Sequence, residues 1–223
     1  MTGERRDAAE RTPPPDFDSV QLTQMIADLR STQGTPFHIS VAVSPFLYRR
    51  DELLDQYTKL ERKVAAGADL AITSGGWDVR KFTELKRYVD SRGLRIPLLG
   101  NVQVLSRREQ MVAGNASAVR VSPALADLLR RESDAPDGGL QARLERAARL
   151  LAVLKGLGYA GAYISGTHAA EHISEVLHLA GKFEADWERC AEDVQFGEPD
   201  GFYLEGPAWS ASSGAGGATT AQY

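Results

Sequence analysis

The chain has 223 residues, of which 25% are charged and 43% hydrophobic, and its 26 basic and 30 acidic side chains give a formal net charge of −4. This balance argues against a nucleic-acid-binding protein, whose basic residues would cluster on one face. The lone Cys190 cannot form an intrachain disulfide, the polar N-terminus lacks a signal-peptide region, and no apolar run reaches the roughly 20 residues of a membrane span. We therefore expect a soluble, cytoplasmic protein.

Both ends of the chain have compositions that disfavour packing. Residues 1–15 combine charges with three consecutive prolines, which lack amide donors and favour an extended, solvated backbone. Residues 210–223 are small and glycine-rich, with almost nothing to bury. We expect a flexible N-terminal segment over 1–15, a folded domain over 16–209 and a disordered tail over 210–223.

Between these ends, short apolar runs alternate with helical periodicity. Residues 37–43 are apolar and bounded by turn residues, which predicts a strand. Residues 51–66 carry apolar side chains at helical spacing and end at Gly67, which predicts a helix. The same alternation predicts strands at 69–73, 96–102 and 161–165, a short apolar stretch at 118–121, and helices at 78–92, 107–113, from Pro123, 140–157 and 169–180.

Apolar strands that are each followed by a helix are typical of a parallel sheet covered by helices, so the fold class is α/β. Only about four principal βα units fit, whereas a complete (β/α)8 barrel has eight strands and about 250 residues. An open four-stranded sheet has two unpaired edges that invite pairing with another chain. We predict either a partial TIM barrel of about four βα units, completed from elsewhere, or a different open-sheet fold.

Two runs, FHISVA at 37–42 and LERKVAAGADLAIT at 60–73, resemble the second half of the methylenetetrahydrofolate reductase family. Further landmarks follow in the family's order: IPLLG at 96–100, VRVSP at 119–123 and LKGLGYAG at 154–161. The resemblance covers roughly residues 1–181 and favours the C-terminal βα units of that family's barrel. It implies FAD as cofactor, and reduction of methylenetetrahydrofolate to methyltetrahydrofolate with NADH or NADPH as hydride donor.

The resemblance also implies five cofactor-binding residues. Gly3 and Glu4 stand where the family has an Arg-Gly-Asp-like turn whose acidic residue lies near the flavin, and Ala42 ends the first matched run. Arg62 and Lys63 align with the family's basic pair near FAD, where a cation can balance a pyrophosphate or the reduced flavin. From the residues alone, this pair is more typical of a solvated helix face.

Ser74, Gly75 and Trp77 are the expected substrate-binding residues. They follow the strand at 69–73, at the end of the strand where barrels place their active sites, and glycines there let a ligand approach the backbone. Trp77 can stack on a planar ring, although an aromatic residue at such a junction more often packs. The alternative is a simple strand-to-helix turn with Asp78 as the helix cap.

Several family positions carry other residues here. After strand 69–73 the family has glutamine, Phe-like residues and aspartate, whereas this chain has Ser-Gly-Gly-Trp-Asp at 74–78. The family's tyrosine, acid and histidine after the preceding strand become Ser44, Phe46 and Tyr48. The general-acid glutamate of the family's first strands and the arginine after its last strand have no counterpart. No catalytic residue is therefore assigned.

Three motifs near the last strand suggest other chemistry. The HAAEH run at 168–172 matches the H-x-x-E-H pattern of inverted zinc peptidases, but five residues match easily by chance, so we expect no metal site. Gly166 and Thr167 open a helix after a strand, a place that suits a phosphate or an ordinary turn equally well. Cys190 has no recognisable base partner, so we expect no nucleophilic role.

The sequence thus predicts a methylenetetrahydrofolate reductase-like, flavin-dependent oxidoreductase of one-carbon metabolism. One alternative is a non-catalytic or partner-requiring barrel half with an assembly or regulatory role. The other is a divergent member that acts on another methyl or one-carbon substrate. The expected partners are a small-molecule substrate and either further copies of the chain or a complementing chain that supplies the missing strands, with no nucleic acid and no membrane.

Overall fold

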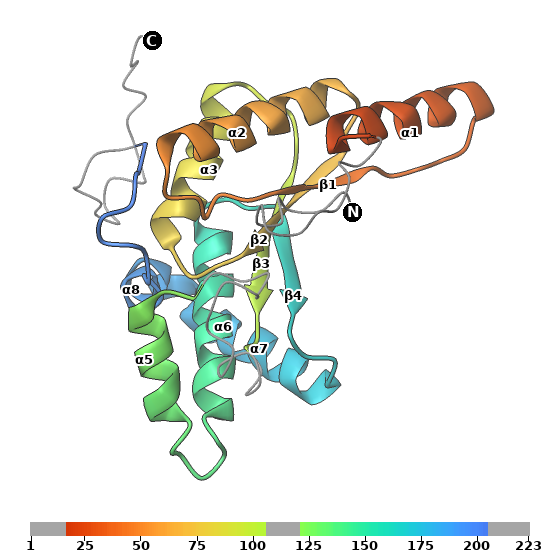
Figure 1. Ribbon diagram of the computed structural model, residues 1–223. Helices are drawn as coiled ribbons and strands as arrows, with labels where there is room; N and C mark the ends of the chain where they lie inside the picture. Colours follow the sequence, from red (N-terminus) through yellow and green to blue (C-terminus); the bar gives the residue numbers. More distant parts are fainter. Residues whose placement is uncertain (1–16, 106–120, 205–223) are drawn as a thin grey trace, which may run out of the picture.

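The computed structural model describes residues 17–105 and 121–204 (Figure 1). The predicted flexible segment and disordered tail, the helix at 107–113 and nearly all of the stretch at 118–121 lie outside the described residues. The boundaries of the folded domain therefore stay a prediction. Within the described residues, no helix combines the length and apolar character needed to cross a membrane.

Four parallel strands form one sheet in the order β1-β2-β3-β4. They are β1 (Ser40–Val43), β2 (Leu70–Gly75), β3 (Leu98–Gln103) and β4 (Gly161–Ser165). Each strand lies beside the next one along the chain, as in a barrel, whereas a doubly wound sheet reverses its strand order at a switch point. The predicted parallel α/β sheet is confirmed, and its strand order is that of a partial TIM barrel.

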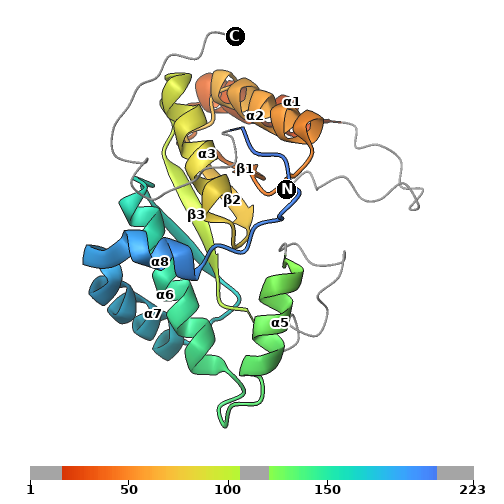
Figure 2. The same ribbon diagram turned by 90° about the vertical axis from the view of Figure 1, so that its left-hand side faces the viewer.

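A helix follows each strand, as predicted, and Figure 2 views the molecule from the side where α3, α6 and α8 lie in front of the sheet. The helices are α1 (Ser19–Gln33), α2 (Arg50–Ala65), α3 (Val79–Ser91), α5 (Pro123–Glu132), α6 (Leu140–Gly156), α7 (Ala170–Phe183) and α8 (Trp187–Asp193), with a 3-10 turn, η1 (Glu184–Asp186), before α8.

One face of the sheet is packed under these helices. Alternate strand residues such as Val41, Ala71 and Val102 are buried in the hydrophobic core. At Gly100 on β3 an added Cβ would overlap the side chain of Leu154 on α6, so only glycine lets this helix approach so closely. Burial of this face supplies the main stabilisation of the sheet.

The opposite face, here called the open face, carries Ala42, Ser44, Ile72, Ser74, Leu99, Asn101, Tyr163 and Ser165, none of which is buried. Tyr163 is 51% exposed, whereas Gln103, the register partner of Ser165, is buried. In a closed barrel this face lines the interior and is covered by the remaining strands.

Two helices and one boundary differ from the expectation. Sequence reasoning missed α1, although the Asp18 carboxylate accepts from the Val20 and Gln21 amides and Gln21 bonds back to the Asp18 amide, a full capping box. It also missed α8. The first strand begins at Ser40 rather than at residue 37, and Phe37 is exposed.

Candidate ligand site at the carboxyl ends of the strands

The side chains on the open face change from apolar to polar along the strands. Near the middle of the sheet, Ala42 pairs with Ile72 and Ile72 with Leu99, which makes an apolar row. Toward the carboxyl ends, the residues become polar. The second group, here called the polar row, consists of Ser44, Ser74, Asn101, Tyr163 and Ser165. Parallel barrels place their ligands at this end of the strands.

Hydrogen bonds join members of the polar row across the strands. The hydroxyl oxygens of Ser44 and Ser74 lie 2.9 Å apart. The Ser165 hydroxyl donates to Oδ1 of Asn101 at 2.7 Å. These groups are neutral donors and acceptors, which suits an uncharged polar heterocycle better than a phosphate. Ser74, predicted from the sequence, belongs to this row; Asn101, Tyr163 and Ser165 were missed because they lie inside apolar strand patterns.

The rest of the predicted substrate loop packs inward. Gly75 and Gly76 are buried, and a Cβ at Gly76 would lie about 2.5 Å from the Phe46 ring. The Trp77 ring is buried in the core, and its carbonyl accepts from the Phe196 amide at 2.6 Å. The structure therefore brings Ser74 alone of this loop to the open face.

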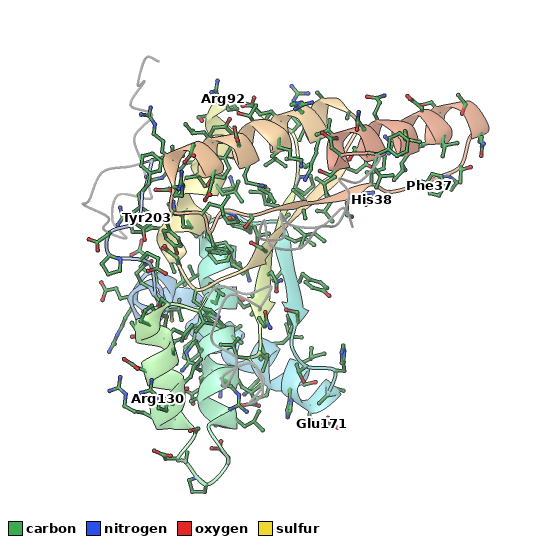
Figure 3. The ribbon with its side chains drawn as sticks, viewed as in Figure 1. Phe37, His38, Arg92, Arg130, Glu171 and Tyr203 are labelled. Atoms are coloured by element: carbon green, nitrogen blue, oxygen red, sulfur yellow. The ribbon has the colours of Figure 1, made fainter. Side chains whose placement is uncertain are left out.

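Asp78 caps α3, as predicted, and also holds the C-terminal segment. Its fully buried carboxylate accepts from the hydroxyls of Tyr48 at 2.9 Å and Tyr203 at 2.8 Å and from the amide of Gln195 at 2.8 Å. Burial, followed by the Asp78 charge, raises the pKa of both tyrosines. Figure 3 shows Tyr203 beside the start of α3, where this segment crosses the loops after β1 and β2.

Buried Lys81 provides a second attachment for the same segment. Its ammonium donates to the Phe202 carbonyl at 2.6 Å and to Glu84 at 3.2 Å, and it lies 4.5 Å from the centre of the Tyr203 ring. Burial lowers the pKa of Lys81, while Glu84 acts against this shift. Through the Phe202 carbonyl and the Tyr203 ring, the segment after α8 packs back on the fold.

Two of the predicted cofactor residues meet at the edge of the sheet. The Lys63 ammonium, on α2, donates to the Ala42 carbonyl at 2.6 Å. Lys63 is 6% exposed, and burial lowers its pKa to about 8. Arg62 is exposed on the next helical position, and Gly3 and Glu4 lie outside the described residues.

The Lys63 ammonium, held by the Ala42 carbonyl, has the charge that an anionic group needs. The Leu70 amide donates to the Ile39 carbonyl, and carbonyls alternate along a strand, so the Ala42 carbonyl points away from β2. Among the described residues, the hydrogen-bond partner of the Lys63 ammonium is a neutral carbonyl, and a poorly solvated ammonium gains from a nearby anion. The charge of Lys63 therefore suits an anionic group beside β1.

The motifs around the start of α7 serve local structure. Gly166 has φ +81°, and a Cβ there would overlap the Val104 carbonyl. Thr167 Oγ1 lies 3.0 Å from Nδ1 of His172, and Figure 3 shows Glu171 on the outside of the first turn. Among the described residues, no three His, Cys, Asp or Glu side chains gather as metal ligands.

Cys190 does not belong to this site. It is a free, buried thiol on α8, and burial raises its pKa, which disfavours the nucleophilic thiolate.

No curated protein gives a significant match. Among solved structures, an uncharacterized protein from Clostridium thermocellum that binds two copies of 5-methyl-5,6,7,8-tetrahydrofolic acid superposes with a TM-score of 0.52 at 11% identity, a likeness that shows the fold alone. The match covers 76% of this chain and 60% of that protein. A family model described as methylenetetrahydrofolate reductase matches residues 1–160, and the chain belongs to this family.

Proposed function

We propose that this chain binds a reduced folate at the polar row and takes part in the reduction of methylenetetrahydrofolate to methyltetrahydrofolate. The observation that carries the proposal is the set of neutral hydrogen-bonding groups at the carboxyl ends of the strands, with Ser44 bonded to Ser74 and Asn101 bonded to Ser165. Family membership and a solved structure of similar fold that binds 5-methyl-5,6,7,8-tetrahydrofolic acid support the same ligand class.

The chemistry of the pterin ring matches these residues. Its edge carries adjacent amide and amino groups, which need both donors and acceptors. A serine hydroxyl can do either, and an asparagine amide presents one of each. The apolar row of Ala42, Ile72 and Leu99 below offers a surface for the flat faces of a ring. Substrate orientation is therefore the task that we assign to the polar row.

FAD is the proposed cofactor, with NADH or NADPH as the hydride donor. When bound, FAD supplies the hydride transfer. Lys63, positioned by its hydrogen bond to the Ala42 carbonyl, would hold its phosphates beside β1 and supply the balancing charge. A cytosolic location belongs to the same proposal, because the free thiol of Cys190 suits a reducing compartment.

One observation favours a second candidate, a folate-binding chain without reductase activity. The described strand residues of the open face include no carboxylic acid that could deliver a proton to the folate. Under either candidate, the outer edges of β1 and β4 would pair with additional strands, from another copy or a complementing chain. The open face would then become a barrel interior.

Ligand titration and turnover test both candidates on the full chain, isolated with any partner that copurifies. Calorimetry should detect 5-methyltetrahydrofolate binding, and the visible spectrum should show flavin. Oxidation of NADH or NADPH that depends on methylenetetrahydrofolate would establish the reductase. Folate binding without oxidation, in protein loaded with FAD, would establish the binding chain instead. Protein that binds no reduced folate would contradict both.

A further inference from the structure

We infer that Tyr163 and Asn101 form the specificity-determining pair for the folate, with Tyr163 stacking on the pterin ring and Asn101 donating to the pterin carbonyl. This inference rests on the proposed function and adds residues that neither the sequence motifs nor the family match assign. It is carried by the exposure of Tyr163, by its register with Asn101 and by the hydrogen bond that orients Asn101.

Tyr163 is unusually exposed for a strand residue. It lies in the middle of β4, yet its side chain is 51% exposed, and neither its ring nor its hydroxyl has a partner among the residues that the structure describes. Its strand neighbours Ala162 and Ile164 pack against the core on the other face. A large, rigid ring on an accessible sheet face can stack on another planar ring.

Asn101 lies directly beside this ring. The two residues are register partners on β3 and β4, and paired strands are about 4.8 Å apart. The Ser165 hydroxyl donates to Oδ1 of Asn101, so Nδ2 is the end of the amide that remains to donate. Within the described part of the chain, no acceptor takes its hydrogens. A stacking surface and an oriented donor therefore sit side by side.

The ligand for this pair is a neutral planar heterocycle with a carbonyl on its edge. Pterin and flavin rings both have this chemistry. Position favours the pterin, because Lys63, whose charge suits the cofactor phosphates, lies beside β1, the opposite edge of the sheet from β4 (Figure 1). Three strand spacings, about 14 Å, separate the two edges.

Substitutions at Tyr163 separate stacking from packing. Tyr163→Phe keeps the ring, and Tyr163→Leu keeps an apolar side chain that can fill a barrel interior but cannot stack. We expect Tyr163→Phe to bind 5-methyltetrahydrofolate like the original chain, and Tyr163→Leu to bind roughly tenfold more weakly. Phe37→Leu is the matched control, since Phe37 is a similarly exposed aromatic residue before β1 (Figure 3) and should leave affinity unchanged.

A second set of binding measurements identifies which ring contacts Tyr163 and whether Asn101 donates to it. Asn101→Asp replaces the free donor end with an acceptor and should weaken binding of tetrahydropterin, the ring fragment without its aminobenzoylglutamate tail. Tyr163→Leu should weaken the same fragment while leaving FAD binding unchanged. Weaker FAD binding with intact tetrahydropterin binding would overturn the inference in favour of a flavin contact.

The outcomes keep the inference separate from the proposed function. If the original chain binds 5-methyltetrahydrofolate and Tyr163→Leu binds it equally well, Tyr163 is a packing residue and the inference is wrong while the proposed function stands. If the original chain binds no reduced folate, both are wrong. Circular dichroism and thermal unfolding of each variant show whether lost binding reflects lost folding.

Discussion

Lys63 extends from α2 to the outer edge of β1, where its ammonium nitrogen lies 2.6 Å from the carbonyl oxygen of Ala42. The sequence resemblance assigned both residues to the cofactor from separate runs, and the fold brings them together. The contact holds a buried positive charge of α2 against the edge of the sheet, so it affects the stability of the chain.

The lowered pKa of Lys63 makes a stability prediction. Its pKa falls from the ordinary 10.5 to about 8 because burial disfavours the charged form. Between these values the unfolded chain binds more protons than the folded one, so this residue makes folding more favourable as pH rises from about 8 to 10.5. The shift corresponds to at most about 3–4 kcal/mol.

Chemical denaturation of the original chain and of Lys63→Met at pH 7 and pH 10 checks this prediction. The difference between the two proteins isolates Lys63 from the other groups that titrate in this range. We expect the original chain to gain stability relative to Lys63→Met at the higher pH. A difference that stays constant would show that the ammonium is well solvated, contrary to its burial.

Asp78 provides a second prediction, because one buried carboxylate joins the loop after β2 to the C-terminal segment. In Asp78→Asn, an amide nitrogen facing the Tyr48 and Tyr203 hydroxyls would bring donors against donors. We expect unfolding free energy to fall by about 2–4 kcal/mol. Asp90→Asn is the control: its exposed pair with Lys86 should contribute less than about 1 kcal/mol.

Limited proteolysis distinguishes local from global damage in Asp78→Asn. If Asp78 holds the C-terminal segment, cleavage within 194–204 should accelerate before the sheet unfolds. Equal loss of stability in Asp78→Asn and Asp90→Asn would remove the special role of this carboxylate.

The sequence predicted the fold well because its strongest signals are local. The strand at 161–165 and the cap at Asp78 follow from apolar runs and turn residues, and the structure shows them within a residue or two. Helix α1 was missed because its apolar stripe is weak, although its capping box was readable at Asp18 and Gln21.

The site was harder to predict because its members meet only through strand register. Nothing in the local pattern around Tyr163 or Asn101 distinguishes a ligand-facing side chain from a core residue. Their pairing depends on how β3 and β4 align, which is a tertiary property. Trp77 shows the reverse case, since its aromatic character suggested stacking and the fold places its ring in the core.

Gly100 supplies a third prediction, about how closely α6 packs on β3. A Cβ at this position overlaps the Leu154 side chain, so Gly100→Ala should destabilise the chain by about 1–3 kcal/mol through overpacking. Leu154→Ala alone should cost about 2–5 kcal/mol, because it leaves a cavity in the core.

The double variant Gly100→Ala/Leu154→Ala tests whether contact between residue 100 and Leu154 causes the loss of stability in Gly100→Ala. If it does, the added methyl group fills part of the cavity left by Leu154→Ala. The double variant should then lose less stability than the two single variants lose together. Denaturant unfolding of all four proteins measures this coupling. Additive effects would mean that the backbone at Gly100, rather than Leu154, limits the substitution.

Ser74 supplies the last prediction, which separates a binding role from a structural one. Its hydroxyl lies on the open face and bonds only to the Ser44 hydroxyl among the described groups, so Ser74→Ala removes a half-buried hydrogen bond. Stability should change by no more than about 1 kcal/mol. Affinity for 5-methyltetrahydrofolate should fall by roughly fivefold, because a neutral ligand hydrogen bond contributes about 1 kcal/mol.

Ser133→Ala is the matched control for this test, since Ser133 has an exposed hydroxyl at the end of α5, away from the polar row. The two variants should have similar stability, and calorimetry should detect weaker folate binding in Ser74→Ala alone. Unchanged affinity in Ser74→Ala would place the ligand nearer to β3 and β4. In that case Tyr163 and Asn101 would bind the ring without help from β2.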